Sequence, residues 1–182
     1  MSRVCVFFAT GYEEMEALSV VDLLVRAKID VDMVSVTDSL SVTSSHGVRV
    51  MMNKTLRDVD FTQVEMIVLP GGMPGTTNLE ETDKLMAQVD DFVASERWVA
   101  AICAAPTILG HRGHLEGREA CCYPGKEAEL TGAKISYEKV CVDGHIITSR
   151  GAGTALAFGL KIVEVIKGQK QAEALAESIV YV

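Results

Sequence analysis

The chain has 182 residues, enough for one domain with a sizeable core, and we expect residues 1–182 to fold as a single unit. A net charge of −8 without any basic run argues against nucleic acid or an anionic membrane surface as a partner, and favours small molecules or proteins. No apolar run is long enough to cross a bilayer. Five cysteines without a CxxC pair, and no signal peptide before the first strand, indicate the reducing cytoplasm.

The first part of the chain alternates apolar strands with an amphipathic helix. A continuous apolar run at 4–9 predicts a strand that is covered on both faces. Acidic residues then begin a helix predicted to run from 13 to about 27, and a second strand follows at 31–36. Two alternating segments, 40–43 and 48–52, flank a Ser-Ser-His-Gly turn and predict an antiparallel hairpin.

The remainder of the chain continues this alternation of strands and helices. The later predicted elements are a strand at 65–69, a helix at 83–95, a strand that ends at Cys103, a hairpin of 140–142 with 146–149, and helices at 154–166 and 172–180. Residues 70–75, Pro-Gly-Gly-Met-Pro-Gly, are too rich in glycine for regular structure and predict a tight binding loop.

Strands that are nearly all apolar and alternate with helices predict a doubly wound α/β fold with a mostly parallel central sheet. In such sheets the binding sites lie at the carboxyl ends of the strands. We therefore expect four loops to meet at one crevice, residues 11–16, 70–75, 103–106 and 149–153.

Cys103 is the first candidate functional residue, because it lies where strand 98–102 passes into a helix that starts near Pro106. Ala101 and Ala105 are small, as the close backbone approach at a sharp bend requires. This is the pattern of a nucleophile elbow with a thiol in place of a hydroxyl. The N–H groups of the helix should favour the thiolate, so we predict a reactive Cys103 with a low pKa. The alternative is an inert buried cysteine.

Glu16 is a candidate partner for this cysteine. Its successors on the same helix face, Val20, Leu23 and Ala27, are all apolar. Burial raises the pKa of a carboxyl group, so Glu16 could stay protonated near neutral pH and donate a hydrogen bond to a Cys103 thiolate. The alternative is that Glu16 is only a first-turn acid that helps the helix to start.

The glycine-rich loop offers a candidate oxyanion site. If the loop folds over the cysteine, the Gly71-Gly72 step and the N–H of Ala104 would together form an oxyanion pocket. The alternative is a turn that needs glycine for positive φ and has no further role.

The histidines and the remaining cysteines do not suggest a further site. No Cys-His-Asp triad is predicted, and surface positions are the simpler interpretation for the four histidines, His46, His111, His114 and His145. Neither Cys121 nor Cys122 has metal-ligand spacing to a histidine, so both are interpreted as structural and no metal is expected.

Four segments, in order along the chain, contain the motifs of a known protein family. They are Gly11-Tyr-Glu-Glu-Met-Glu16, Leu69-Pro-Gly-Gly72, Ala100-Ala-Ile-Cys-Ala-Ala-Pro106 and Thr148-Ser-Arg-Gly-Ala-Gly-Thr154. In these motifs and their spacing the chain resembles the ThiJ/PfpI superfamily, which is class I glutamine amidotransferase-like, and its DJ-one/ThiJ branch more than its protease-like branch. The resemblance covers nearly the whole chain.

This resemblance implies a flavodoxin-like three-layer α/β sandwich that is usually a homodimer. It implies Cys103 as the reactive cysteine, Glu16 as the protonated acid that hydrogen-bonds to it, and an oxyanion site made by the amides of Gly72 and Ala104. It implies no cofactor.

Tyr123 differs from the residue frequent in the superfamily, whereas Arg26 matches it. A frequent histidine followed by proline aligns with Tyr123 before Pro124. Tyrosine is a poor base at neutral pH, so a peptidase assisted by histidine is not supported, and proton transfer would fall to Glu16 or to a substrate group. Arg26 matches an arginine that lies near the dimer face and the site in relatives; the alternative is a surface helix cation.

The resemblance supplies reactive aldehydes as the substrate class. The first hypothesis is an enzyme of the glyoxalase III or protein deglycase type: Cys103 adds to methylglyoxal, glyoxal or their early adducts on proteins, Glu16 moves protons, and water releases a hydroxy acid such as lactate. The second is a non-enzymatic redox sensor or chaperone of the oxidative stress response, with Cys103 oxidised to a sulfinate. A cysteine peptidase or a role in thiazole biosynthesis has less support from the residues.

Overall fold

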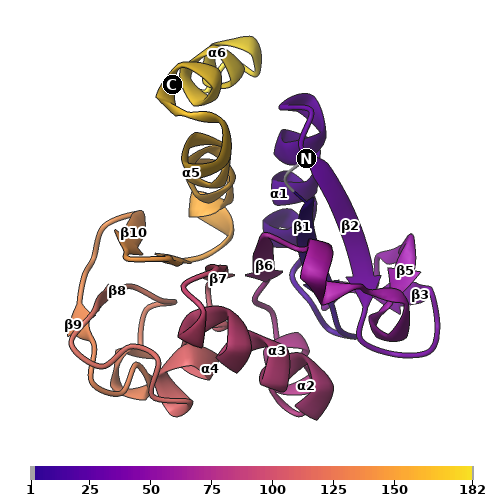
Figure 1. Cartoon of the computed structure of the whole chain (residues 1–182), viewed down its shortest axis with the longest axis horizontal. Helices are drawn as coiled ribbons and strands as arrows, with labels where there is room; N and C mark the ends of the chain where they lie inside the picture. Colours follow the sequence, from indigo (N-terminus) through magenta and orange to yellow (C-terminus); the bar gives the residue numbers. More distant parts are fainter. Residues whose placement is uncertain (1–2, 182) are drawn as a thin grey trace.

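The computed structural model describes residues 3–181 and contains a seven-stranded sheet between two layers of helices (Figure 1). The strands of this sheet are β1 (Arg3–Phe8), β2 (Asp30–Ser35), β5 (Lys54–Thr55), β6 (Met66–Leu69), β7 (Trp98–Ile102), β10 (Val140–Asp143) and β11 (Ile146–Ser149). Their order is β10-β11-β7-β6-β1-β2-β5, and every neighbouring pair is parallel except β10 with β11. The predicted doubly wound α/β fold is confirmed.

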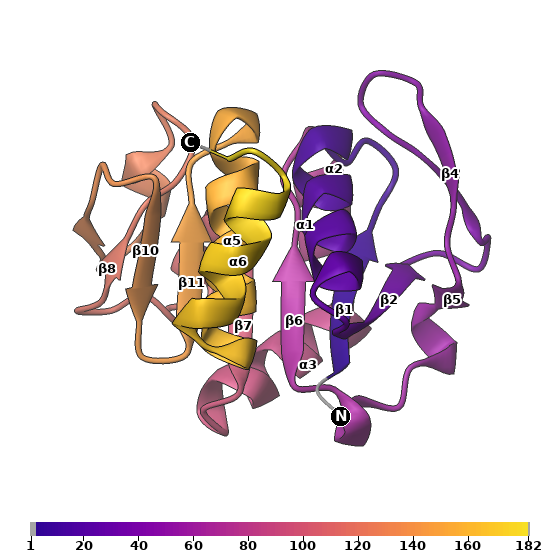
Figure 2. The ribbon, with the colours of Figure 1, turned by 90° about the horizontal axis from the view of Figure 1, so that it is seen from above.

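Helices cover both faces of the sheet. One face carries α1 (Glu14–Arg26) and α5 (Ala155–Lys167), with α6 (Gln169–Ser178) packed on α5, and the other carries α2 (Gly75–Glu80), α3 (Asp83–Ala94) and α4 (Pro106–His111) (Figures 1 and 2). Within residues 3–181 no helix is long and apolar enough to cross a membrane.

Two hydrophobic cores lie on the two faces of the sheet, because successive side chains of a strand point to opposite faces. In β1, Val4, Val6 and Phe8 belong to the core under α1 and α5, whereas Cys5 and Phe7 belong to the core under α3 and α4. All five side chains are fully buried. Burial on both faces is the physical reason why this strand is a continuous apolar run.

The element boundaries agree with the sequence-based prediction at most positions. The predicted helices at 13–27 and 83–95 are α1 and α3, and the predicted hairpin is β3 (Ser41–Thr43) with β4 (Arg49–Met51), which pair antiparallel outside the main sheet. Two short paired strands, β8 (Glu119–Ala120) and β9 (Lys134–Ile135), were not predicted. The prediction that the glycine-rich segment lacks regular structure is wrong at its last residue, because Gly75 is the first residue of the six-residue helix α2. Thr76 and Leu79 of this helix are buried.

The topology brings three loops together at one edge of the sheet. The chain starts at β1, moves outward to β2 and β5, and returns to β6 on the other side of β1. Because β6 lies between β1 and β7, the loops that follow these three parallel strands meet at their carboxyl ends. The first leads into α1 and Glu16, the second contains Gly71, and the third contains Cys103.

Candidate active site

Cys103 lies on a sharp bend immediately after β7. Its φ of +66° is uncommon for a residue other than glycine. Its N–H donates a hydrogen bond to the carbonyl of Ser149 at 3.0 Å, and its carbonyl accepts one from the N–H of Tyr123 at 2.8 Å. Ala101 and Ala105 are fully buried on either side. These contacts hold the strained backbone of the predicted nucleophile elbow on both sides.

Glu16 lies in the first turn of α1, and only 1% of its surface is exposed. Its Oε2 accepts a hydrogen bond from the N–H of Gly71 at 2.9 Å, and its carboxyl group is also hydrogen-bonded to the thiol of Cys103. Burial raises the pKa of Glu16 from 4.5 to about 7, although both hydrogen bonds act in the opposite direction. The buried acid with a raised pKa is therefore found where the apolar helix face predicted it.

Gly71 leaves the space in which Glu16 and Cys103 meet. A Cβ atom on Gly71 would lie 2.5 Å from Cys103 Cβ, 2.7 Å from Glu16 Oε2 and 3.0 Å from Cys103 Sγ. Even a methyl group would therefore push the thiol and the carboxyl group apart. The N–H of Gly71 is engaged by Glu16, so the expectation that it contributes to an oxyanion pocket is corrected: Gly71 positions the acid.

The amides of Gly72 and Ala104 both donate hydrogen bonds to the sulfur of Cys103. Gly72 has a φ of +90°, and a Cβ atom there would lie 2.4 Å from the N of Glu13, so this position requires glycine. An oxygen on a carbon bound to Sγ would lie near the same two donors. The two amides are those that the family resemblance implies for an oxyanion site.

The thiol of Cys103 does not have the predicted low pKa. Burial of the sulfur, followed by the charge of Glu16 and the hydrogen bond to it, raises the pKa of Cys103 from 9.0 to about 12, and the amides of Gly72 and Ala104 offset only part of this. The helix that follows, α4, has only six residues. Since the pKa of Glu16 is about 7, Glu16 is the first of the pair to lose its proton. Glu16 is thus placed to accept the thiol proton during attack, rather than to stabilise a thiolate that already exists.

Tyr123 and Arg26 lie at very different distances from this pair. Tyr123 is next to the elbow, because its backbone N–H donates a hydrogen bond to the carbonyl of Cys103. Tyr123 is 52% exposed. Arg26 lies at the opposite end of α1 from Glu16, about 15 Å along the helix axis, and its Nε is 2.7 Å from Asp22 Oδ2. Within one chain Arg26 does not reach the site.

The histidines take part in contacts remote from the sulfur. The histidine contacts include His46 Nδ1 with Glu14 Oε1 at 3.0 Å, His111 Nδ1 with Glu80 Oε1 at 2.7 Å, His114 Nε2 with Asp90 Oδ1 at 2.7 Å, and the His145 ring with the Trp98 ring at 5.0 Å between centroids. Glu13, Glu14 and His46 have ligand atoms within 4.8 Å of one another, which is compatible with a metal ion. The carboxylate side chains of Glu13 and Glu14 are 15% and 19% exposed, and the side chain of His46 is 66% exposed. This group does not include the thiol.

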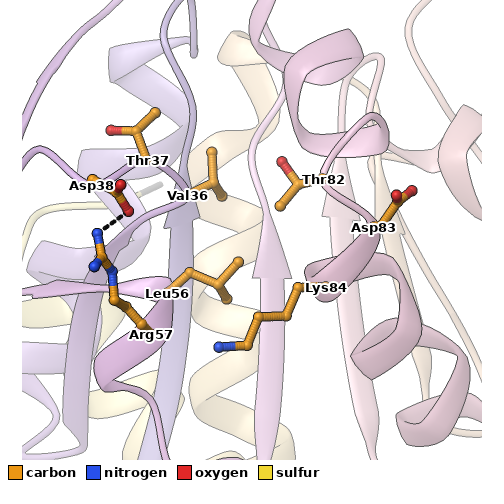
Figure 3. Close-up of a pocket in the computed structure, with 8 residues that line it drawn as sticks. All are labelled: Val36, Thr37, Asp38, Leu56, Arg57, Thr82, Asp83 and Lys84. Atoms are coloured by element: carbon orange, nitrogen blue, oxygen red, sulfur yellow. Dashed lines mark ion pairs between the residues drawn. The ribbon is translucent and has the colours of Figure 1, made fainter.

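Two cavities lie at the carboxyl ends of the parallel strands. One of about 380 Å³ lies beside the end of β2; an ion pair of Arg57 with Asp38 lines it, and no cysteine does (Figure 3). The other, of about 350 Å³, borders the elbow. Its lining residues are Tyr123, Pro124, Lys139, Arg150 and residues 151–154. Arg150 lies in one of the family motifs, whereas no sequence signal pointed to Lys139.

The parallel sheet, the strained cysteine after β7 and the buried acid beside it define a flavodoxin-like α/β protein with a cysteine–carboxyl site. The sequence model of the DJ-1/PfpI family matches residues 2–165, and the chain belongs to this family.

Individual relatives agree with this assignment. Protein DJ-1 homolog B of Arabidopsis thaliana is 34% identical over 97% of this chain, although the chain spans only 40% of the length of that relative. The glutathione-independent glyoxalase DJR-1.2 of Caenorhabditis elegans is 32% identical over 92% of this chain and 89% of the relative. The structure of oxidized Toxoplasma gondii DJ-1 has a TM-score of 0.95 at 35% identity, and covers 100% of this chain and 99% of that one.

Proposed function

We propose that this protein is a cofactor-independent enzyme that converts α-oxoaldehydes such as methylglyoxal into hydroxy acids such as lactate. The observation that carries the proposal is the hydrogen bond between the Cys103 thiol and a carboxyl group whose pKa burial raises to about 7. A base with a pKa near the working pH is the most effective general base, and a thiol is a strong nucleophile for aldehydes. The relative from Caenorhabditis elegans that is named a glyoxalase supports the same reaction class.

The reaction begins with attack of Sγ of Cys103 on the aldehyde carbon. A C–S bond forms, the carbonyl electrons move to oxygen, and the thiol proton passes to Glu16. The N–H groups of Gly72 and Ala104 stabilise the new oxyanion. The oxyanion then takes the proton back from Glu16, which gives a hemithioacetal and returns Glu16 to its carboxylate form. The arrangement that supports these steps is that the acid and the two amides all interact with the sulfur of Cys103.

A proton transfer completes the rearrangement. Glu16 removes the proton from the former aldehyde carbon, and a proton returns to the neighbouring carbon, which produces a thioester of the hydroxy acid. Water hydrolyses the thioester and releases the hydroxy acid and the free thiol. The sum is addition of one water to the α-oxoaldehyde, so atoms and electrons balance without an oxidant. Early adducts of these aldehydes on proteins, which are hemithioacetals or hemiaminals, would first release the protein thiol or amine and restore the free aldehyde, which then follows the same steps.

Purified protein and methylglyoxal, without glutathione, provide the test. We expect lactate to form, and Glu16→Gln to lower kcat/KM by about 100-fold or more, because the variant cannot accept the thiol proton. Glu14→Gln, which alters a neighbouring acid of the same helix turn, should stay within about threefold. Lactate formation no faster than in buffer, or equal rates for wild type and Glu16→Gln, would rule the proposal out.

A second candidate function is redox sensing by the same sulfur. The relative from Toxoplasma gondii is described as oxidized, and two amides and an acid around Sγ could hold the oxygens of a sulfinate. Mass spectrometry after mild peroxide treatment tests this function. Addition of two oxygens at Cys103 alone supports it, whereas equal oxidation of all five cysteines contradicts it.

We also propose that two chains pair through α1 and the β3–β4 hairpin. Met15 and Met51 are 59% and 61% exposed, and Val25 is also exposed on α1. The hairpin is joined to the start of α1, because Ser45 Oγ donates to Glu13 Oε2 at 3.4 Å. Sedimentation at micromolar concentration should give a dimer, and Met51→Glu should weaken it.

We also propose that the protein is located in the cytoplasm. The five cysteines, none of which forms a disulfide, support this location.

A further inference from the structure

The cavity of about 350 Å³ is built onto the same backbone bend that carries the thiol. One wall contains Tyr123, whose N–H donates to the carbonyl of Cys103 at 2.8 Å. The opposite wall begins at Arg150, directly after Ser149, whose carbonyl accepts the N–H of Cys103 at 3.0 Å. The walls approach closely, since a Cβ atom on Gly151 would lie 3.5 Å from the Tyr123 ring. The cavity therefore adjoins the backbone bend of Cys103, although Cys103 itself is not one of its lining residues.

The charge of the cavity is opposite to that of the protein. Lys139 and Arg150 line it, and no acidic residue does, although the chain carries a net charge of −8. In the described part of the chain, neither cation forms an ion pair with a carboxylate. Arg150 donates one N–H to the Tyr137 carbonyl at 3.4 Å, and its guanidinium carbon lies 5.7 Å from the centroid of the Tyr137 ring. Within residues 3–181 the other N–H groups of this guanidinium donate no hydrogen bond, so they can bind a ligand.

The cavity beside β2 shows that this charge pattern is not general in the molecule. It also contains two cations, Arg57 and Lys84, but it contains two acids as well, Asp38 and Asp83 (Figure 3). Arg57 is already ion-paired to Asp38 there. Uncompensated positive charge is thus found beside the candidate nucleophile and not in the similarly sized cavity at the far edge of the sheet.

We propose that the cavity lined by Arg150, Lys139 and Tyr123 binds a carboxylate group of the substrate, so that the preferred substrates are α-oxoaldehydes that carry a carboxylate. The planar guanidinium group of Arg150 matches the two carboxylate oxygens, Lys139 adds a second positive charge, and the hydroxyl of Tyr123 can donate a hydrogen bond. This inference rests on the proposed aldehyde chemistry of Cys103. It also explains a tyrosine at a position where relatives often have histidine, since a donor suffices for binding.

Alkylation of Cys103 tests the subsite without any turnover. Iodoacetate carries the carboxylate and iodoacetamide is its uncharged analogue, and peptide mapping gives the rate for Cys103 with each reagent. We expect Arg150→Gln to lower the ratio of the iodoacetate rate to the iodoacetamide rate about five- to tenfold, because a nearby cation is lost. Arg150→Lys, which keeps the charge, should retain most of the ratio. Lys167→Gln removes a charge at the far end of α5 and should leave it unchanged.

Turnover then separates this inference from the proposed function. Dioxovalerate is an α-oxoaldehyde that ends in a carboxylate, and propylglyoxal is an uncharged analogue of the same chain length. We expect kcat/KM to favour dioxovalerate in wild type, and Arg150→Gln to reduce that preference more than Lys167→Gln does. Turnover of both substrates with no change of preference in Arg150→Gln or Lys139→Gln would overturn the subsite alone. Turnover of neither, with an alkylation ratio that still depends on Arg150, would overturn the enzyme and leave the anion subsite standing.

Discussion

Cys5 lies within a parallel strand of the central sheet and Cys103 directly after one, and their thiols have similar acidity but different surroundings. Cys5 lies inside β1, where burial and then the charge of Asp32 raise its pKa to about 12. Cys103 lies just beyond β7, where burial and then the charge of Glu16 raise its pKa to about 12 as well. The acidity of the thiol therefore does not distinguish the two residues.

What distinguishes Cys103 is a partner that can take its proton. Glu16 contacts the thiol and has a pKa of about 7, and the amides of Gly72 and Ala104 point at the sulfur. Cys5 has instead Asp32, whose carboxyl group accepts hydrogen bonds from Lys54 and Asn53. A buried thiol becomes a candidate nucleophile through a neighbouring base and oriented donors, and not through a lower pKa of its own.

Removal of each thiol in turn should give the largest difference between Cys103 and Cys5. Cys103→Ala should lower the rate of lactate formation by about 1,000-fold or more, because the nucleophile is lost. Cys5→Ala should keep the rate within about twofold and lower the free energy of unfolding by about 1 kcal/mol through lost packing. Both rates come from the methylglyoxal assay, and unfolding from urea titration. Similar loss of activity in both variants would mean that Cys103 acts only through the fold.

The pH dependence of stability isolates the cost of ionising Glu16. A raised pKa means that the folded state holds the proton more tightly, so the contribution of Glu16 to stability is fully present below pH 4.5 and is lost as the pH rises to about 7. Glu16→Gln remains neutral and still offers an oxygen to the N–H of Gly71. Relative to wild type, the variant should therefore gain about 3 kcal/mol of unfolding free energy between pH 4 and pH 8.

Urea titrations of both proteins at the two pH values give this difference directly. Cys5→Ala provides the control, because it should show the same pH dependence as wild type. A difference between Glu16→Gln and wild type that stays constant with pH would contradict the raised pKa of Glu16.

The Gly71→Ala variant separates the thiol from the acid while keeping both. The added methyl group would lie within 2.7 Å of Glu16 Oε2, so we expect kcat/KM to fall about 50-fold. Gly113→Ala is the matched control, because Gly113 has a φ of +75° and no atom within 4 Å of its Cβ position. That control should lose about 1 kcal/mol of stability through backbone strain and keep its activity. Equal activity in the two variants would show that the contact is dispensable.

The smallest expected effect is in the pH profile of Cys103 alkylation by iodoacetamide. In wild type the rate should rise through an inflection near pH 7, because ionised Glu16 can accept the thiol proton. In Glu16→Gln that inflection should disappear, and the rate at pH 8 should be about tenfold lower. Cys5 in the same samples should stay unmodified at every pH. A wild-type profile that rises only above pH 9 would contradict the role of Glu16 as base.

Most of the fold was predictable because its signals are local. The apolar runs of β1 and β6, the acids that begin α1 and the Asp-Gly turn between β10 and β11 each depend on a few adjacent residues. The short α2 and the β8–β9 pair were missed because six residues or fewer carry too weak a periodic signal, and tertiary contacts hold them in place. The apolar face of α1 likewise predicted that Glu16 is buried.

The α/β class, the bend at Cys103 and the burial of Glu16 could be read from the sequence, because each follows from the pattern of neighbouring side chains. The ionisation of the thiol required the tertiary structure, since it depends on burial and on the carboxyl group of Glu16, which lies on helix α1. The tertiary structure also decided that Gly71 holds the acid, that Arg26 lies far from the site, and that Lys139 and Arg150 share a cavity. These are relations between residues far apart in the chain, which close packing creates and no local pattern encodes.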